Sequence, residues 1–177
     1  MRLFHVSEES DIEIFHPRLP TRADLDPKVG LVWAIDEKHL PNFLTPRNCP
    51  RVAYHVGEQT TEADRRKFFT SASQSYALVL EHGWLERMRS TSLYLYEFAP
   101  NDFILQDAVA GYHVATTTQY PKAKYRLEDL FAELAKRNVE VRLVDNLWDI
   151  AQAVQCSTLN WSLCRMGYAQ PKRERKL

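Results

Sequence analysis

The chain has 177 residues and carries 23 basic and 23 acidic side chains, so its formal net charge is zero. Hydrophobic residues make up 45% and charged residues 26%, which is ordinary for a globular protein that folds without disulfides or metal. The balanced charge lacks the basic excess that nucleic-acid-binding proteins and polybasic membrane anchors carry, so neither kind of partner is favoured. The length favours one domain, which we expect over residues 1–170 with a charged flexible tail over 171–177.

The spacing of the cysteines and the composition of the N-terminus indicate the cellular compartment in which the protein is expected. Cys49, Cys156 and Cys164 show no C-x-x-C spacing, and the six histidines are scattered. This pattern predicts neither a disulfide framework nor a metal site. The N-terminus lacks the apolar segment of a signal peptide, and no apolar run approaches the roughly 18 residues of a membrane span. We therefore expect a soluble cytoplasmic protein with no membrane partner and no metal.

Taken in chain order, the hydrophobic pattern predicts more strands than helices. The predicted strands are residues 2–6, 30–35, 51–56, 76–80, 92–98, 103–105, 112–118 and 139–144. Helices are expected after Asp36 towards Leu44, after Thr60 or Thr61, and over 84–88, 127–137 and 147–154, followed by an apolar segment over 159–166. Short strands that do not alternate regularly with helices predict an α+β fold with two small mixed or antiparallel sheets and flanking helices.

Phosphate-binding motifs of the doubly wound folds are absent from the sequence, because neither G-x-G-x-x-G nor G-x-x-x-x-G-K-[ST] occurs. Two other positions attract attention. His5 shares a face of the first strand with Ser7, where it would donate a hydrogen bond to a ligand or be a satisfied, half-buried histidine. Trp33 and Phe43 lie on consecutive elements, where they would form a stacking slot for a planar ring or simply pack in the core.

Nucleophile chemistry has little support in the sequence. No G-x-S-x-G elbow occurs. Cys49 lies between Arg47 and Arg51, which would favour a thiolate if both guanidinium groups pointed inward. Pro46 and Pro50 interrupt this stretch, however, and are more typical of a turn with solvated arginines.

Four short motifs carry a family resemblance over nearly the full length of the chain. They are Trp33-Ala34-Ile35-Asp36, Pro46-Arg47-Asn48-Cys49-Pro50-Arg51-Val52, Ala110-Gly111-Tyr112-His113-Val114 and Ser157-Thr158-Leu159, together with Arg165-Met166 near the C-terminus. With these motifs the chain resembles an uncharacterised bacterial family of domains of unknown function. The N-terminal half, with Leu-Phe-His-Val-Ser, His16-Pro17-Arg18 and Val-Trp-Ala-Ile-Asp, also resembles ADP-ribosyltransferase-like domains.

The second resemblance implies an ADP-ribosyltransferase-like fold with a cleft between two small sheets that binds NAD or another adenine nucleotide. His5 matches the histidine that hydrogen-bonds the adenosine side of NAD, and Trp33 takes the place of the residue that stacks on nicotinamide. His5, Trp33 and Phe43 would then line one cleft, and arginines beside it would suit a pyrophosphate. The residues implied in nucleotide binding are His5, Ser7, Arg18, Trp33, Phe43, Arg47, Arg51 and Tyr112.

The sequence departs from the transferase pattern at its carboxylate. The strand expected to carry this acid has Gly111, Thr116, Thr117 or Thr118 at the position, depending on alignment. A hydroxyl cannot supply the charge that stabilises an oxocarbenium-like transition state. Two hypotheses therefore stand: a nucleotide-binding or protein-interaction module without catalysis, and an active mono-ADP-ribosyltransferase or NAD glycohydrolase. The second would use a relocated catalytic acid, either Glu97 or Asp107.

Overall fold

The computed structural model describes residues 1–20 and 24–173, which form two compact units. Unit 1 consists of Met1–Phe43 and Ser92–Glu128, and unit 2 consists of Leu44–Thr91 and the chain from Asp129 onward. Each unit has its own sheet. That the two act as the single domain expected over 1–170 remains a prediction. Across the described residues, no helix combines the length and the apolar character needed to cross a bilayer.

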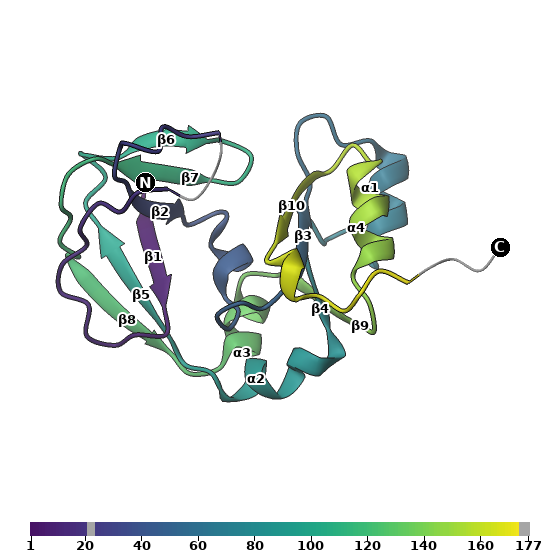
Figure 1. Cartoon of the computed structure of the whole chain (residues 1–177). Coiled ribbons are helices and arrows are strands. Elements are labelled where there is room, and N and C mark those ends of the chain that lie inside the picture. The colour runs from purple at the N-terminus through teal and green to yellow at the C-terminus, as the bar shows by residue number, and fades with distance from the viewer. Residues whose placement is uncertain (21–23, 174–177) are drawn as a thin grey trace. The chain divides into compact units, whose positions relative to one another are not determined.

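The sheet of unit 1 is antiparallel throughout. Within the described residues it has six strands in the order β6-β7-β2-β1-β5-β8, and β1, purple in Figure 1, lies between β2 and β5. The strands are β1 (Leu3–Ser7), β2 (Val32–Asp36), β5 (Leu93–Phe98), β6 (Ile104–Asp107), β7 (Tyr112–Ala115) and β8 (Ala123–Leu127). A 3-10 helix, η1 (Leu40–Phe43), follows β2.

Alternation along the strands of unit 1 separates its two faces. Tyr96 and Phe98 of β5 pack with Leu3 and Ala34 in a buried cluster that Phe15 covers. Leu93, Leu95 and Glu97 point to the opposite face, as the alternating pattern over 92–98 predicts, because successive side chains of a strand point to opposite sides.

The sheet of unit 2 is mixed. Its four strands within the described residues have the order β10-β3-β4-β9, and β4 and β9 are parallel while the other neighbours are antiparallel. The strands are β3 (Arg51–His55), β4 (Tyr76–Glu81), β9 (Glu140–Val144) and β10 (Asn160–Cys164). The helices are α1 (Glu62–Phe68), α2 (Leu85–Ser90), α3 (Leu130–Lys136) and α4 (Trp148–Gln155), with 3-10 turns η2 (His82–Trp84) and η3 (Met166–Tyr168). The predicted α+β class with two mixed or antiparallel sheets is confirmed, and the structure shows that one sheet is antiparallel and the other mixed.

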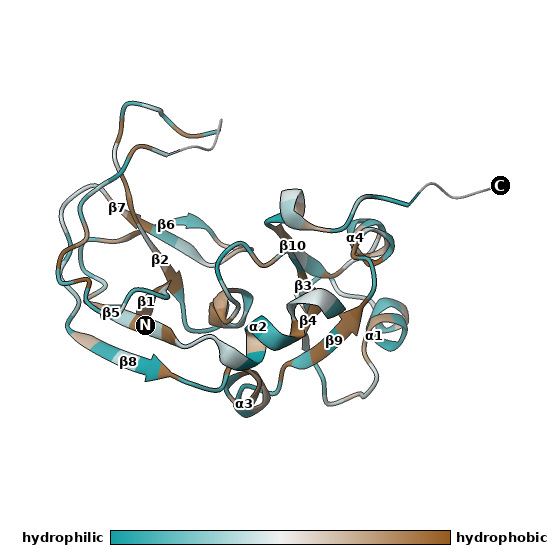
Figure 2. Ribbon diagram, turned by 60° about the horizontal axis from the view of Figure 1, so that its bottom comes forward, coloured by the Kyte–Doolittle hydropathy of each residue, from teal (hydrophilic) through white to brown (hydrophobic). Residues whose placement is uncertain are grey.

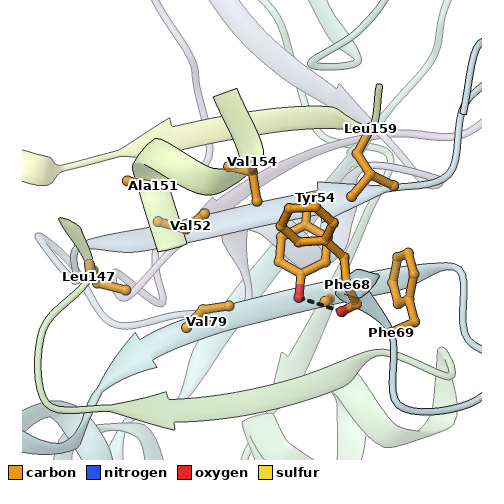
Figure 3. Packing of buried hydrophobic residues seen from close by; sticks show 10 residues of the cluster. Val52, Tyr54, Phe68, Phe69, Val79, Leu147, Ala151, Val154 and Leu159 are labelled. Atoms are coloured by element: carbon orange, nitrogen blue, oxygen red, sulfur yellow. Dashed lines mark hydrogen bonds between the residues drawn. The ribbon is translucent and has the colours of Figure 1, made fainter. Parts of the chain in front are cut away.

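Helices α1 and α4 cover one face of this second sheet. Phe68 of α1 and Val154 of α4 pack against Tyr54 and Val79 of the central strands (Figure 3). The Tyr54 hydroxyl donates a hydrogen bond to the Phe68 carbonyl oxygen at 2.9 Å, which satisfies the one polar atom of this side chain in the cluster. Burial raises the pKa of Tyr54 to about 12, so this hydroxyl stays a donor at all ordinary pH values.

The solvent-facing part of α1 is strongly polar, and Figure 2 shows this helix mostly in the teal of hydrophilic residues. Its start is fixed by a side chain, as the sequence predicts: the Thr61 hydroxyl accepts a hydrogen bond from the Asp64 N–H at 3.2 Å. Because α1 buries only Phe68 of its own residues, this cap carries much of its local stability.

Replacing Thr61 with alanine is expected to lower the free energy of unfolding by about 1 kcal/mol, since it removes an N-cap acceptor. Urea unfolding followed by circular dichroism measures this change. Thr116→Ala is the matched control, because Thr116 is exposed and lies outside the helices. Equal stability of the Thr61→Ala variant and the wild type would contradict the capping role.

Two predicted helices differ from those observed. The helix expected over 127–137 begins only at Leu130, because the Asp129 carboxylate caps it by accepting from the Ala132 N–H at 2.9 Å. Leu127 instead ends β8, a strand that the sequence pattern did not predict. The helix expected after Asp36 towards Leu44, for which Pro41 predicts a late start or an irregular course, is the single 3-10 turn of η1. A proline inside a helix removes a backbone donor, which explains the shortening.

The tail predicted over 171–177 makes contacts in its described part. The Pro171 carbonyl accepts a hydrogen bond from the Asn146 side chain at 2.9 Å, and Arg173 pairs with Asp145 at 2.8 Å. Residues 174–177 of this prediction lie outside the described residues.

Candidate functional site

Strands β2 and β7 lie side by side in unit 1 and bring two of the sequence motifs together. In their antiparallel register Ile35 is opposite Tyr112 and Ala34 is opposite His113. The motif that begins at Trp33 and the motif that ends at Val114 therefore form one continuous patch of sheet. This pairing makes the surroundings of Gly111 the best candidate for a functional site in unit 1.

Three aromatic side chains, which we call the aromatic cluster, gather on one side of this patch. The rings of Trp33 and Tyr112 have centroids 5.3 Å apart and are nearly perpendicular, at 83°. The rings of Phe43 and Tyr112 are 5.7 Å apart at 70°. These are edge-to-face contacts, which aromatic quadrupoles favour. All three side chains are partly exposed, so the cluster is not simply sealed core.

A pair formed by the partly exposed Asp36 and the buried His39 lies at the end of β2. One Asp36 carboxylate oxygen is 2.7 Å from His39 Nδ1 and also accepts from the His39 backbone N–H at 2.9 Å. Burial pushes the pKa of Asp36 upward, but the two hydrogen bonds from His39 and the proximity of His113 outweigh it and hold the pKa below its ordinary value. The pair therefore fixes the imidazole ring of His39 in one orientation.

Gly111 makes room for this pair. Its φ of +72° is in the left-handed region, and a Cβ at this position would lie 2.2 Å from His39 Nδ1. Its carbonyl accepts a hydrogen bond from the Asp36 N–H at 3.1 Å. No carboxylate side chain fits at position 111, one of the places where the transferase pattern would have put its acid.

His5 is not part of the aromatic cluster. The pairing of Leu3 with Asp36 and of Phe4 with Ile35 places His5 on the same face as Ala34, and Trp33 on the other face. His5 packs against Phe15 with ring centroids 4.9 Å apart, and its Nδ1 is 3.2 Å from the Trp33 carbonyl oxygen. Burial lowers the pKa of His5. The expected cleft with His5, Trp33 and Phe43 along one wall is therefore not formed by these three side chains.

Two more of the predicted binding residues lie near His5. The Ser7 hydroxyl accepts a hydrogen bond from the Glu9 N–H at 3.1 Å. Arg18 is exposed, and its backbone forms a two-way bridge to Leu31 at 3.1 and 2.9 Å.

Arg47 and Arg51 belong to unit 2 and do not activate Cys49. Arg47 is exposed, whereas Arg51 is buried and its Nη1 donates to the Cys49 carbonyl oxygen at 3.0 Å. Burial raises the pKa of the Cys49 thiol to about 12, more than the nearby Arg51 and Arg87 lower it. Cys49 is therefore a neutral core thiol at physiological pH, and the thiolate that inward-pointing arginines would favour does not form.

Glu97 already holds a full set of partners in unit 1. It is buried, and its two oxygens accept from Arg2 Nε and Nη2 at 3.0 and 2.9 Å. The Tyr125 hydroxyl donates to it at 2.9 Å, and Lys122 Nζ lies 3.1 Å away. The Arg2 hydrogen bonds, against the opposing effect of burial, lower the pKa of Glu97 to about 2.

Asp107 and the threonines have local roles. One Asp107 carboxylate oxygen accepts from the backbone N–H groups of Val109 and Ala110, each at 3.0 Å, and so shapes the turn between β6 and β7. The Thr117 hydroxyl accepts from Gln119 at 2.9 Å, and the Thr118 hydroxyl lies 3.3 Å from His16 Nδ1. Thr116 is exposed.

Sequence reasoning missed His39 and His113. The available signal was the spacing Asp36-x-x-His39 directly after a buried strand, where an acid caps the next turn and meets a histidine three residues later. Among the described residues, no group of three or more histidine, cysteine, aspartate or glutamate side chains is placed to hold a metal ion.

Residues 4–169 match the model of a family of unknown function, DUF6886. The match covers most of the chain, so the protein belongs to this family. No curated protein and no solved structure matches the chain.

Proposed function

We propose that unit 1 binds a ligand with a planar ring, an adenine nucleotide such as NAD or ADP-ribose, and acts as a non-catalytic binding module. The observation that carries this proposal is the aromatic cluster of Trp33, Phe43 and Tyr112, which is partly exposed. The assignment of the fold as ADP-ribosyltransferase-like is part of the same proposal and rests on the resemblance of the N-terminal motifs, without the shared cleft of His5, Trp33 and Phe43.

The cluster has the chemistry that ring stacking needs. Aromatic side chains bind planar heterocycles through their faces and edges, and a base stacked on one such side chain contributes about 1–3 kcal/mol. Tyr112 contacts both other rings, so it is the central residue of the cluster. The hydrogen bonds of Asp36 and His39 hold the chain between Trp33 and Phe43 and thereby fix the spacing of the rings.

Binding without transfer is favoured over catalysis. A relocated acid would have to direct a carboxylate at the nicotinamide ribose. The Glu97 oxygens are already taken by Arg2, Tyr125 and Lys122, and the Asp107 carboxylate is bound to its own turn. The alternative of an active transferase or glycohydrolase would require one of these acids to leave its partners.

Titration calorimetry with NAD and ADP-ribose tests the proposal. We expect saturable binding by the wild type and at least a tenfold loss of affinity in Tyr112→Leu, because stacking on the central ring is lost. Tyr120→Leu is the matched control, since Tyr120 is an exposed tyrosine of the same unit outside the cluster. Absence of binding by the wild type, or equal loss in both variants, would contradict the proposal.

Nicotinamide release separates binding from catalysis. We expect none on incubation with NAD. Release that depends on Glu97 or Asp107, measured with Glu97→Gln and Asp107→Asn, would establish the transferase or glycohydrolase alternative instead.

A further inference from the structure

A cavity in unit 2 lies at the carboxyl ends of two parallel strands, independently of the proposed nucleotide site in unit 1. The last residues of β4 and β9, Glu81 and Val144, are paired in register, and the cavity opens directly beyond them with a volume of about 350 Å³. Its polar lining includes Glu81, His82, Asp145, Asn146, Gln170 and Arg173. Carboxyl ends of parallel strands are common ligand positions, and this volume is within the range of small-molecule sites.

Glu81 is the buried charged group of this cavity. It is only 3% exposed, and its oxygens accept hydrogen bonds from two backbone N–H groups, Leu147 at 3.3 Å and Gln170 at 3.1 Å. Among the described residues no lysine or arginine forms an ion pair with it. A buried carboxylate without a cationic partner is costly, and a cation entering the cavity would offset that cost.

The rim of the cavity is also polar and is fixed in place. Asp145 and Arg173 form an exposed ion pair at 2.8 Å, and the hydrogen bond from Arg173 holds the pKa of Asp145 below its ordinary value. The Asn146 side chain accepts from the Trp148 N–H at 3.0 Å and donates to Pro171. The lining therefore combines two acidic side chains, Glu81 and Asp145, with the guanidinium of Arg173 and the imidazole of His82.

We propose that this cavity binds a small organic cation, with an ammonium group of the ligand placed against the Glu81 carboxylate. The buried acid supplies the attraction, and the volume of about 350 Å³ suits a small molecule. The two backbone N–H groups on Glu81 hold its oxygens in position, so little reorganisation accompanies binding.

Three probes of the same length but different charge test the site: 1,4-diaminobutane, 1,4-butanediol and succinate. Titration calorimetry on the full chain should show saturable binding of the diamine only. In a ¹⁵N-labelled sample the diamine should shift the amide resonances of Gly83, Leu147 and Gln170, which lie on or beside the lining. Equal binding of the diol, binding of succinate, or no binding of the diamine would overturn the proposal.

Substitutions of acidic residues test where in the cavity the diamine binds. Glu81→Gln should weaken diamine binding at least tenfold, whereas Glu86→Gln, which changes an exposed acid of α2, should leave it unchanged. Because Glu81 also tethers two backbone segments, Asp145→Asn provides a second variant at an exposed position, with an expected loss of about threefold from weaker long-range attraction. If neither Asp145→Asn nor a folded Glu81→Gln protein shows weaker diamine binding, the cation binds elsewhere and the proposal is overturned.

Discussion

Gly111→Val is expected to destabilise unit 1 by about 4 kcal/mol, because the valine must adopt a left-handed backbone and overlap a buried ring. A positive φ costs a residue with a Cβ about 1–2 kcal/mol, and more when it is β-branched, while overpacking in a close-packed interior adds about 1–3 kcal/mol. The Cβ would lie 2.2 Å from His39 Nδ1, and the ring cannot simply move away while Asp36 holds it. Urea unfolding followed by near- and far-ultraviolet circular dichroism measures the change.

Two further variants separate the causes. Gly167→Ala is the matched control, because a Cβ at Gly167 meets nothing within 4 Å, and it should change stability by less than about 0.5 kcal/mol. Combining Gly111→Ala with His39→Ala removes the overlap with the imidazole ring but keeps the positive φ and the 2.7 Å approach to the His39 Cβ, so the double variant should still be destabilised but should lose less than the sum of the two single variants. Additive effects, or a Gly111→Val protein as stable as the wild type, would refute the packing of Gly111 against His39.

Glu97→Gln is expected to lower the free energy of unfolding by about 2 kcal/mol at pH 7. The substitution removes the charge that binds Arg2, Lys122 and the Tyr125 hydroxyl, and hydrogen bonds to charged groups are individually worth about 1.5–3 kcal/mol. The value stays well below the sum of these contacts because the Arg2 and Lys122 side chains are 43% and 51% exposed and therefore screened by water.

The same residue predicts an acid-sensitive stability. The pKa of Glu97 falls from an ordinary 4.5 to about 2 in the folded protein, so the unfolded chain binds the proton more tightly. Its contribution is fully present above pH 4.5 and is lost as the pH falls towards 2. Urea unfolding between pH 7 and pH 2 should show a steeper decline for the wild type than for Glu97→Gln, with Glu86→Gln behaving as the wild type. Parallel pH profiles of wild type and Glu97→Gln would contradict the ion-pair role.

Much of the fold was accessible from the sequence because alternation and capping are local signals. The run Leu93–Phe98 shows its two faces directly, and Thr61 marks the start of α1. The hydrophobic pattern does not predict strand β8, because the middle of this strand is exposed and partly charged and only Leu127 is buried. Its pairing with β5 is a long-range contact that the local sequence does not reveal. The helix predicted over 127–137 begins too early, because Leu127 fits the spacing of the helix as well as the alternation of the strand that it ends.

The candidate site was only partly accessible. Trp33, Phe43 and Tyr112 were named, and the structure brings these three rings together. The family resemblance predicts that His5 lies beside these rings. The register of β1 with β2 places it on the opposite face of the sheet, and this register depends on partners far along the chain. The spacing Asp36-x-x-His39 is a local signal for the contact between these two residues. The position of His113 and the close approach of Gly111 to His39 depend on the pairing of β2 with β7, which leaves no local pattern.

The division of the chain into interleaved segments has a consequence for synthesis on the ribosome. The central strand β1 of unit 1 needs β5, and Arg2 needs Glu97, 95 residues further on. The whole of Leu44–Thr91 is therefore made before the first strand can acquire its second neighbour. Unit 2 in turn waits for β9 and β10 near the end of the chain. Neither unit can be completed vectorially, and chains released early would expose the edges of β1 and β4.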